Sequence, residues 1–303
     1  MTKSIGIFGA KGFIGRHLVR RLASVGRPVI AFGRSFPVHY ADIIGYPVEI
    51  REIDFNDVIG TQAKIQDVST VVQLINSSSP SLGNLHVSSD FRSNVAPHVD
   101  FIESCIASGV EAFLFISSGG TVYGNPYYLP IDEGHPTCPI NSYGLTKLII
   151  EHYIRLLTQQ GGMSYVNLRV SNPYGPGQSV NKGQGLIASI LQKRAEGEPV
   201  IIYGDGSIQR DYLYIDDVVD AVIAAIDTRG LKATLNIGSG IGRSVLDVIS
   251  ALETVLGEKI ATSFVEGRST DARSNILNAS RAKEILGWTP KWDFIEGLRQ
   301  TAG

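Results

Sequence analysis

The stretch Ser4-Ile5-Gly6-Ile7-Phe8-Gly9-Ala10-Lys11-Gly12-Phe13-Ile14-Gly15 decides the fold. An apolar run closed by a glycine is typical of a buried parallel strand, and the apolar positions that follow recur at helical spacing. Glycines between a strand and a helix allow a tight turn, and they let a pyrophosphate approach the backbone at the helix N-terminus. A tight turn without a ligand is the alternative interpretation. The place of this turn inside a strand–helix–strand pattern favours dinucleotide binding, although the spacing Gly-x-x-Gly-x-x-Gly differs from the usual Gly-x-Gly-x-x-Gly.

Outward from this turn, short apolar runs alternate with helical patterns. The runs predict further buried strands at 29–32, 48–50, 71–74, 112–116, 165–168 and 235–237. Helical spacing predicts helices at 14–25, 95–107 and 145–157. This alternation predicts an α/β protein with a Rossmann-like, doubly wound parallel sheet and a smaller C-terminal substrate-binding domain.

The character of the chain changes after about Asn172, where turns rich in Gly and Pro become frequent. Helices are expected at 186–195 and 244–256, and strands are expected to be sparse. A helix at 218–226 and the strand at 235–237 are expected to return to the sheet. The predicted dinucleotide-binding domain is therefore 1–170 with part of 211–237, and the substrate-binding domain is 171–210 with 238–303.

Composition excludes several classes of protein. The 303 residues are 43% hydrophobic, which excludes a disordered or collagenous chain. Lys and Arg number 27 against 29 Asp and Glu, and this balance argues against nucleic acid or an anionic membrane as partner. No apolar stretch reaches the roughly 18 residues of a membrane span, and the N-terminus lacks a signal-peptide pattern, so a cytoplasmic protein is expected. Two cysteines without Cys-x-x-Cys spacing and six scattered histidines predict no metal site.

Tyr143 and Lys147 stand four residues apart at the start of a predicted helix, which puts both side chains on one face. An ammonium beside a phenol favours the phenolate and lowers its pKa from about 10, which makes a usable acid and base near neutrality. Ser117, Ser118 and Thr121 follow the predicted strand 112–116, at the carboxyl end where ligands bind in such sheets. A Tyr and a Lys at this spacing are more often exposed residues without a catalytic role. Together with the glycine turn, however, Tyr143 and Lys147 predict a catalytic site.

The segment after the second strand bears on the choice between NAD and NADP. An acidic residue there would accept hydrogen bonds from the adenosine ribose 2′-OH, but this chain has Gly33-Arg34-Ser35. Arg34 and Ser35 suit a 2′-phosphate, which favours NADP slightly. The alternative is a solvated arginine beside NAD.

With these motifs in place, the sequence resembles the extended short-chain dehydrogenases/reductases, in the nucleotide-sugar epimerase/dehydratase group and close to the UDP-glucose 4-epimerases. The matching motifs run in family order over nearly the whole chain. They are the glycine turn 9–15, Asp54-Phe55, Asn94, 117–124, 143–147, 168–177, 204–217 and Gly287-Trp288.

The resemblance implies a role for each matching residue. Tyr143 would be the acid/base, and Lys147 would bind the nicotinamide ribose. Gly119 stands where the family usually has a catalytic Ser or Thr, so Ser118 or Thr121 would have to supply that hydroxyl. The implied cofactor contacts are Gly9, Gly12, Phe13, Ile14, Gly15, Arg34, Asp54, Phe55, Asn94, Ser117, Tyr143, Lys147 and Pro173. The implied substrate contacts are Asn172, Arg210 and Arg268 at the diphosphate and Tyr203 near the base.

The resemblance also ranks the reactions. Dehydratases of the group need an Asp-Glu pair where this chain has Gly120-Thr121, which argues against dehydration, and Asp132-Glu133 is expected to be only a polar turn. The leading hypothesis is a nucleotide-sugar 4-epimerase of the UDP-glucose/UDP-galactose type, an isomerase that works by transient oxidation at C4 with NAD or NADP. The alternatives are an NADPH-dependent 4-keto nucleotide-sugar reductase and, from another class, a catalytically weak nucleotide-binding or regulatory protein. A homodimer through the helices at 95–107 and 145–157 is expected.

Overall fold

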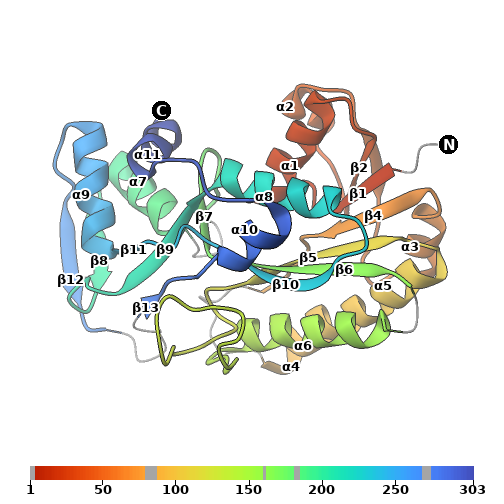
Figure 1. The fold of residues 1–303 in the computed structure, drawn as a ribbon. Helices are drawn as coiled ribbons and strands as arrows, with labels where there is room; N and C mark the ends of the chain where they lie inside the picture. The colour runs from red at the N-terminus through yellow and green to blue at the C-terminus, as the bar shows by residue number, and fades with distance from the viewer. Residues whose placement is uncertain (1–3, 79–86, 160–161, 181–184, 268–273) are drawn as a thin grey trace.

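A seven-stranded parallel sheet forms the larger part of the molecule (Figure 1). The computed structural model describes residues 4–78, 87–159, 162–180, 185–267 and 274–303. The strand order β10-β6-β5-β4-β1-β2-β3 is that of a doubly wound sheet, which confirms the predicted fold class. The strands are β1 (Ser4–Phe8), β2 (Val29–Gly33), β3 (Glu49–Glu52), β4 (Val68–Gln73), β5 (Ala112–Ser118), β6 (Ser164–Val170) and β10 (Lys232–Ile237).

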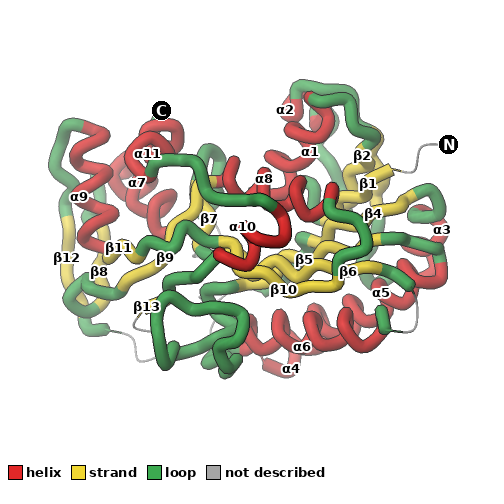
Figure 2. Tube along the Cα trace, viewed as in Figure 1, coloured by secondary structure: helices red, strands yellow, loops and turns green. Residues whose placement is uncertain are grey.

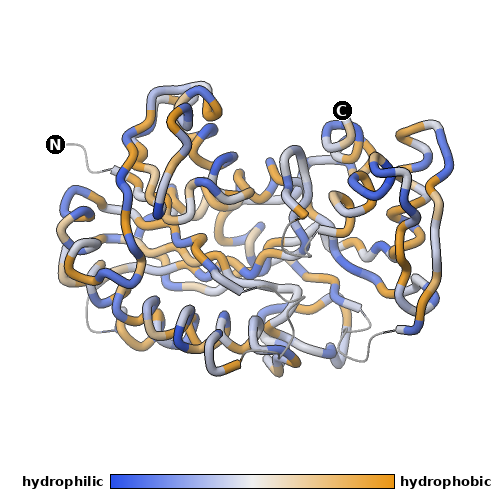
Figure 3. The backbone as a smooth tube through the Cα atoms, turned by 180° about the vertical axis from the view of Figure 1, so that it is seen from behind, coloured by the Kyte–Doolittle hydropathy of each residue, from blue (hydrophilic) through white to orange (hydrophobic). Residues whose placement is uncertain are grey.

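Helices cover both faces of this sheet (Figure 2). On one face α1 (Phe13–Ser24) packs beside α8 (Ile215–Asp227), and on the other α5 (Ala96–Ala107) packs beside α6 (Ser142–Leu157). Helices show hydrophobic and hydrophilic segments in alternation, as amphipathic helices do (Figure 3). The shorter helices of this part are α2 (Tyr40–Ile44), α3 (Val58–Lys64), α4 (Val87–Asp90) and the π-helical turn η2 (Phe91–Val95).

The expectation of sparse strands after Asn172 is wrong. One small sheet has the order β11-β9-β13 with β7 on β9, and β8 pairs with β12. These strands are β7 (Asn172–Tyr174), β8 (Val200–Tyr203), β9 (Gln209–Tyr214), β11 (Gly242–Ser244), β12 (Thr262–Val265) and β13 (Ser274–Asn275). The helices beside them are α7 (Leu186–Glu196), α9 (Val245–Leu256), α10 (Ser280–Leu286) and α11 (Phe294–Ala302). Strands such as β9, β11 and β13 are short and rich in polar residues, so they lack the apolar runs by which buried strands are recognised, whereas β8 is an apolar run that is missing from the predicted strands.

The small sheets and their helices meet the large sheet at the carboxyl ends of its strands. The strand order reverses between β1 and β4, and ligands of doubly wound sheets bind in the crevice beside such a reversal. The glycine turn follows β1 there, and Ser117 and Ser118 end β5 nearby. Within the described residues, no helix combines the length and the apolar character that crossing a bilayer requires.

Candidate functional site

The glycine turn between β1 and α1 depends on two of its glycines. Gly9 has a φ of 90°, a conformation that glycine adopts without a steric penalty. A Cβ added to Gly15 would lie 2.3 Å from the Gly9 carbonyl oxygen and 2.9 Å from Ala10 Cα, so only glycine lets α1 approach the turn this closely. Gly12 is the N-cap of α1 and makes no side-chain cap, and the first turn has no acidic residue. The helix N-terminus therefore suits an anion.

The segment after β2 folds back against this turn. The Tyr40 hydroxyl donates to the Ala10 carbonyl oxygen at 2.9 Å, although Tyr40 is buried and belongs to α2. Lys11 Nζ donates to Ser35 Oγ at 3.3 Å, and Arg34 is exposed at the same place in the chain. Between Gly33 and Tyr40 the sequence has no carboxylate. Two cations and a hydroxyl thus stand where a ribose-binding acidic residue is usual.

Tyr143 and two hydroxyl groups come together where β5 ends. Tyr143 lies in the first turn of α6, and its side chain is hydrogen-bonded to that of Ser118. The Asn141 side chain caps α6 by accepting from the Gly144 N–H at 2.8 Å, which starts the helix three residues before the predicted position. A Cβ added to Gly144 would be 2.7 Å from the Thr121 carbonyl oxygen, so Thr121 lies against the same turn.

Lys147 is buried beside Tyr143 and the end of β5. Its Nζ donates to the Ile116 carbonyl oxygen at 2.8 Å, and it lies 4.6 Å from the centre of the Phe115 ring and 5.8 Å from that of the Tyr143 ring. Only 3% of Lys147 is exposed. The structure therefore brings Tyr143, Lys147, Ser118 and Thr121 together, as the spacing predicted for the Tyr/Lys pair.

The predicted lowering of the Tyr143 pKa is wrong in this structure. Burial raises the pKa of Tyr143 to about 12, the hydrogen bond from Ser118 acts to lower it, and the nearby Asp90 carboxylate raises it further. Burial also lowers the pKa of Lys147 to about 7, and the charge of Glu151 opposes that shift. Desolvation thus disfavours the charged form of both residues.

Gly119 cannot be replaced by the usual hydroxyl residue without a rearrangement. A Cβ at this position would lie 2.4 Å from Leu277 Cδ1 and 2.8 Å from the Arg169 carbonyl oxygen. Asn275 also donates to the Gly119 carbonyl oxygen at 2.9 Å. The segment after β5 is therefore packed against β13 and Leu277, and Ser118 and Thr121 are the hydroxyl side chains that remain beside Tyr143.

Three predicted cofactor residues have structural contacts of their own. Asn94 is buried in η2, and its Oδ1 accepts from the Ser77 N–H at 2.9 Å, which fixes the segment after β4. Asp54 is exposed and accepts from the Asn56 N–H at 3.0 Å. Phe55 is partly buried, with its ring 4.9 Å from that of His98.

The predicted substrate residues occupy the small sheets. Asn172 begins β7, and its Nδ2 donates to the Asp211 carbonyl oxygen at 3.0 Å. Arg210 lies on β9 opposite Arg243 of β11. Tyr203 ends β8 and is 38% exposed, and Pro173 follows Asn172 in β7. Arg268 lies outside the described residues.

A contact across the molecule joins these small sheets to α1. Arg16 donates to the Gly177 carbonyl oxygen, and a ring nitrogen of His17 lies 3.1 Å from the Pro176 carbonyl oxygen. Both residues belong to the first turns of the helix that begins at the glycine turn. The predicted cofactor and substrate regions are therefore adjacent in space.

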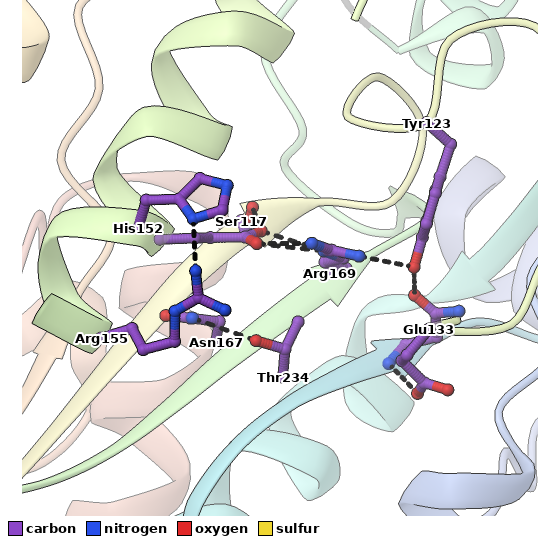
Figure 4. A network of polar contacts seen from close by, with 10 residues as sticks. Ser117, Tyr123, Glu133, His152, Arg155, Asn167, Arg169 and Thr234 are labelled. Atoms are coloured by element: carbon purple, nitrogen blue, oxygen red, sulfur yellow. Dashed lines mark hydrogen bonds and ion pairs between the residues drawn. The ribbon is translucent and has the colours of Figure 1, made fainter. Parts of the chain in front are cut away.

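Sequence reasoning missed several polar residues next to the site. Glu151 and Arg169 form a buried ion pair beneath α6, and Figure 4 shows Arg169 between Ser117 and Tyr123. The signal was available, because Glu151 follows Lys147 at helical spacing. Asp132 and Glu133, expected to form a polar turn, hydrogen-bond to backbone: Asp132 accepts from the Gly134 N–H at 2.9 Å and Glu133 from the Asn236 N–H at 2.7 Å.

Comparison with known proteins adds to this geometry. A sequence model of the "NAD dependent epimerase/dehydratase family" matches residues 5–238. The dTDP-4-dehydro-6-deoxyglucose reductase of Escherichia coli is 31% identical over 96% of this chain and 94% of its own length. A putative UDP-glucose 4-epimerase of Methanocaldococcus jannaschii is 31% identical over 97% of this chain and 95% of its own length. The crystal structure of UDP-glucose 4-epimerase from Thermotoga maritima with UDP-glucose has a TM-score of 0.92 and 32% identity, and it covers 99% of this chain and 97% of that one.

Proposed function

The chain belongs to the NAD dependent epimerase/dehydratase family, and on that premise we propose that it is a nucleotide-sugar 4-epimerase of the UDP-glucose/UDP-galactose type. The observation that carries the proposal is the hydrogen-bonded pair of Tyr143 and Ser118 at the carboxyl end of β5, with Lys147 beneath it. The likeness to 4-epimerases over the whole chain supports it.

In the proposed mechanism Tyr143 takes the proton of the sugar 4-OH and later returns it. Ser118 and Thr121 hold the reacting oxygen by hydrogen bonds, and the Lys147 ammonium favours the phenolate of Tyr143. NAD, when bound, supplies the hydride acceptor and donor at C4 and a positively charged nicotinamide ring. The residues proposed to hold it are Gly9, Gly12, Phe13, Ile14, Gly15, Asp54, Phe55, Asn94, Ser117, Lys147 and Pro173.

The substrate diphosphate is proposed to lie between Asn172 and Arg210, with Arg268 joining them. A guanidinium offers a planar fork of donors that suits a phosphate group. The rings of Tyr203 and the nucleotide base are proposed to lie together. This leaves the sugar beside Tyr143, because Asn172 Oδ1 is 3.9 Å from the position of a Cβ on Gly120, in the segment that carries Thr121.

A Tyr143→Phe substitution tests the proposal. Removing the phenol hydroxyl takes away the acid/base but leaves the glycine turn intact, so we expect epimerisation to fall about 10²–10⁴-fold with NAD affinity nearly unchanged. Coupled turnover assays with UDP-glucose and UDP-galactose give the first quantity, and calorimetry gives the second. Equal epimerisation by the two proteins would reject Tyr143 as the acid/base. No epimerisation by the unaltered protein would rule this epimerase out and leave the reductase and the nucleotide-binding or regulatory protein.

A reductase that uses NADPH is the second candidate. Lys11, Arg34 and Ser35 suit a 2′-phosphate, and the similarity to the Escherichia coli reductase supports this alternative. Denaturing the purified protein and quantifying the nucleotide that it releases separates the two. Near-stoichiometric NAD supports an epimerase that regenerates its cofactor in each cycle. An empty site with reversible NADPH binding, and NADPH consumption during turnover, supports the reductase.

A further inference from the structure

A buried carboxylate lies one helical turn beyond Lys147. Glu151 is 5% exposed, and it is held from two sides by groups of the sheet. Arg169 donates from Nη2 to Glu151 Oε2 at 2.7 Å and from Nε to Oε1 at 3.1 Å, and the Ser117 hydroxyl donates to Oε1. Ser117 and Arg169 are paired residues of β5 and β6. Three donors therefore fix the orientation of one carboxylate.

The same stretch of β5 holds Lys147. The Ile116 carbonyl oxygen accepts from Lys147 Nζ, and the next residue, Ser117, donates to Glu151. Residues four apart on a helix share a face, so Lys147 and Glu151 both point from α6 to the sheet. Both are buried, so bulk solvent screens the interaction between their charges little.

Other charged groups around Lys147 do not replace Glu151. From α5, His98 is buried, and both its burial and the Lys147 charge lower its pKa to about 3, so it is neutral. From β6, Arg169 is cationic and is engaged by Glu151 and by the Tyr123 hydroxyl at 2.9 Å. From α6 itself, Tyr143 is a neutral phenol near pH 7. Asp90 acts on the Tyr143 end of the site.

A buried ion pair usually contributes little to stability compared with apolar side chains of the same size. The cost of burying Glu151 and Arg169 therefore suggests another use for the pair. Glu151 raises the pKa of Lys147 against the effect of burial.

We propose that Glu151 is a positioning residue that keeps Lys147 in its ammonium form, and that Ser117 and Arg169 hold the Glu151 carboxylate for this purpose. The proposal deepens the proposed function, because it rests on Lys147 acting as a cation beside Tyr143. It assigns no contact between Glu151 and substrate or cofactor.

The experiment titrates Lys147 directly in the full chain. Lysine labelled with ¹³C at Cε is observed by NMR between pH 5 and 9, and the Lys147 signal is the one missing from the Lys147→Met protein. In Glu151→Gln, which keeps the shape and removes the charge, we expect the Lys147 midpoint to fall by at least about one pH unit, a tenfold loss of proton affinity. Glu103→Gln, an exposed residue of α5, is the matched control and should leave the midpoint in place.

Activity gives the second readout. The alkaline limb of kcat/KM should move to lower pH in Glu151→Gln, and Glu151→Asp, which restores the charge, should recover part of the shift. A merely structural role would lower activity equally at all pH values. An unchanged Lys147 midpoint in folded Glu151→Gln overturns the proposal. If Glu151→Gln does not fold, the Lys147 midpoint in Glu151→Asp decides. The shorter side chain changes the distance between the carboxylate and Lys147, so an unshifted midpoint in that variant also overturns the proposal.

The two proposals fail separately in these experiments. A shifted Lys147 midpoint in a protein without sugar turnover supports the role of Glu151 and rejects the epimerase. Sugar turnover that depends on Tyr143, with an unshifted Lys147 midpoint, supports the epimerase and rejects the role of Glu151.

Discussion

Burial raises the pKa of Tyr143 and lowers the pKa of Lys147, and both shifts favour the neutral side chain. The pKa of the phenol rises to about 12 and the pKa of the ammonium falls to about 7, so each side chain is pushed toward its neutral form. A proton-transfer site must overcome this tendency at the moment of reaction. At Lys147 the charge of the buried Glu151 carboxylate acts against it.

The depressed pKa of Lys147 predicts how stability depends on pH. The folded value of about 7 lies below the ordinary 10.5, so the unfolded chain binds more protons between these values. Stability from this group is therefore lost as pH falls from about 10 to 7, and the loss is complete below 7. Lys147→Met should raise the free energy of unfolding at pH 6, because methionine removes the cost of burying the ammonium.

Urea denaturation of both proteins at pH 6 and near pH 10 checks this prediction. The difference should shrink toward zero at the higher pH, and activity should be lost in Lys147→Met at every pH. An equal difference at both pH values would mean that Lys147 has an ordinary pKa.

The close packing around Gly119 leads to a second prediction. Gly119→Ser restores the residue type that is usual in the family, but its Cβ would meet the backbone carbonyl of Arg169, which cannot move as a side chain can. We expect a loss of about 1–3 kcal/mol in the free energy of unfolding, as for overpacked cores, and no gain in turnover. Gly120→Ser is the matched control for stability, because its Cβ would have no neighbour closer than 3.9 Å. Comparable stability of the two variants would contradict this account.

Among the elements, α1 shows most directly how a local sequence determines binding. Gly15→Ala should push α1 away from the glycine turn, because the added Cβ would lie 2.3 Å from the Gly9 carbonyl oxygen. Gly12→Ala brings its Cβ only to 3.1 Å from the same oxygen. We expect dinucleotide affinity, measured by calorimetry, to fall more than about tenfold in Gly15→Ala and less in Gly12→Ala, since a displaced helix N-terminus loses the anion. Circular dichroism should show both proteins folded, and equal affinities would rule out this explanation.

The elements that could be predicted from the sequence are those that consist mainly of apolar residues, because such residues are buried in the fold. Most strands of the large sheet could be predicted because they contain apolar runs covered by helices on both faces, whereas β3 is polar and mostly exposed. Strands such as β11 and β13 could not, because they are two or three residues long and hold together by pairing with β9. The sequence likewise predicts Tyr143 and Lys147 by their spacing but not the direction of the Tyr143 pKa. That direction depends on burial, which is a property of the packed fold.

For the whole molecule, we propose the division into a domain of 1–170 with part of 211–237 and a second of 171–210 with 238–303. In the structure β9 belongs to the small sheet, whereas β10 joins the large one and α8 packs against it. The chain thus passes between the two parts several times. Contacts such as Arg16 with Gly177 then join segments that are far apart in sequence.

We also propose that two copies of the chain associate through α5 and α6. On α6, Leu145, Tyr153 and Leu156 are 45%, 38% and 59% exposed, and a second copy of the chain could cover them. Light scattering during gel filtration should give about twice 32.7 kDa. Leu156→Glu should shift the mass toward the monomer, whereas Val38→Glu, an exposed residue outside these helices, should not. A monomer in the unaltered protein would reject the dimer.

The position of β10 has a consequence for the protein during its synthesis. β10 pairs with β6 along its whole length, yet β7, β8 and β9 are all translated between the two strands. A nascent chain on the ribosome therefore carries β6 as an open edge, with the apolar residues Val166 and Leu168 that the finished fold buries. Unpaired edges of this kind recruit other chains. We therefore expect the newborn protein to be prone to aggregation in the interval before Lys232 emerges.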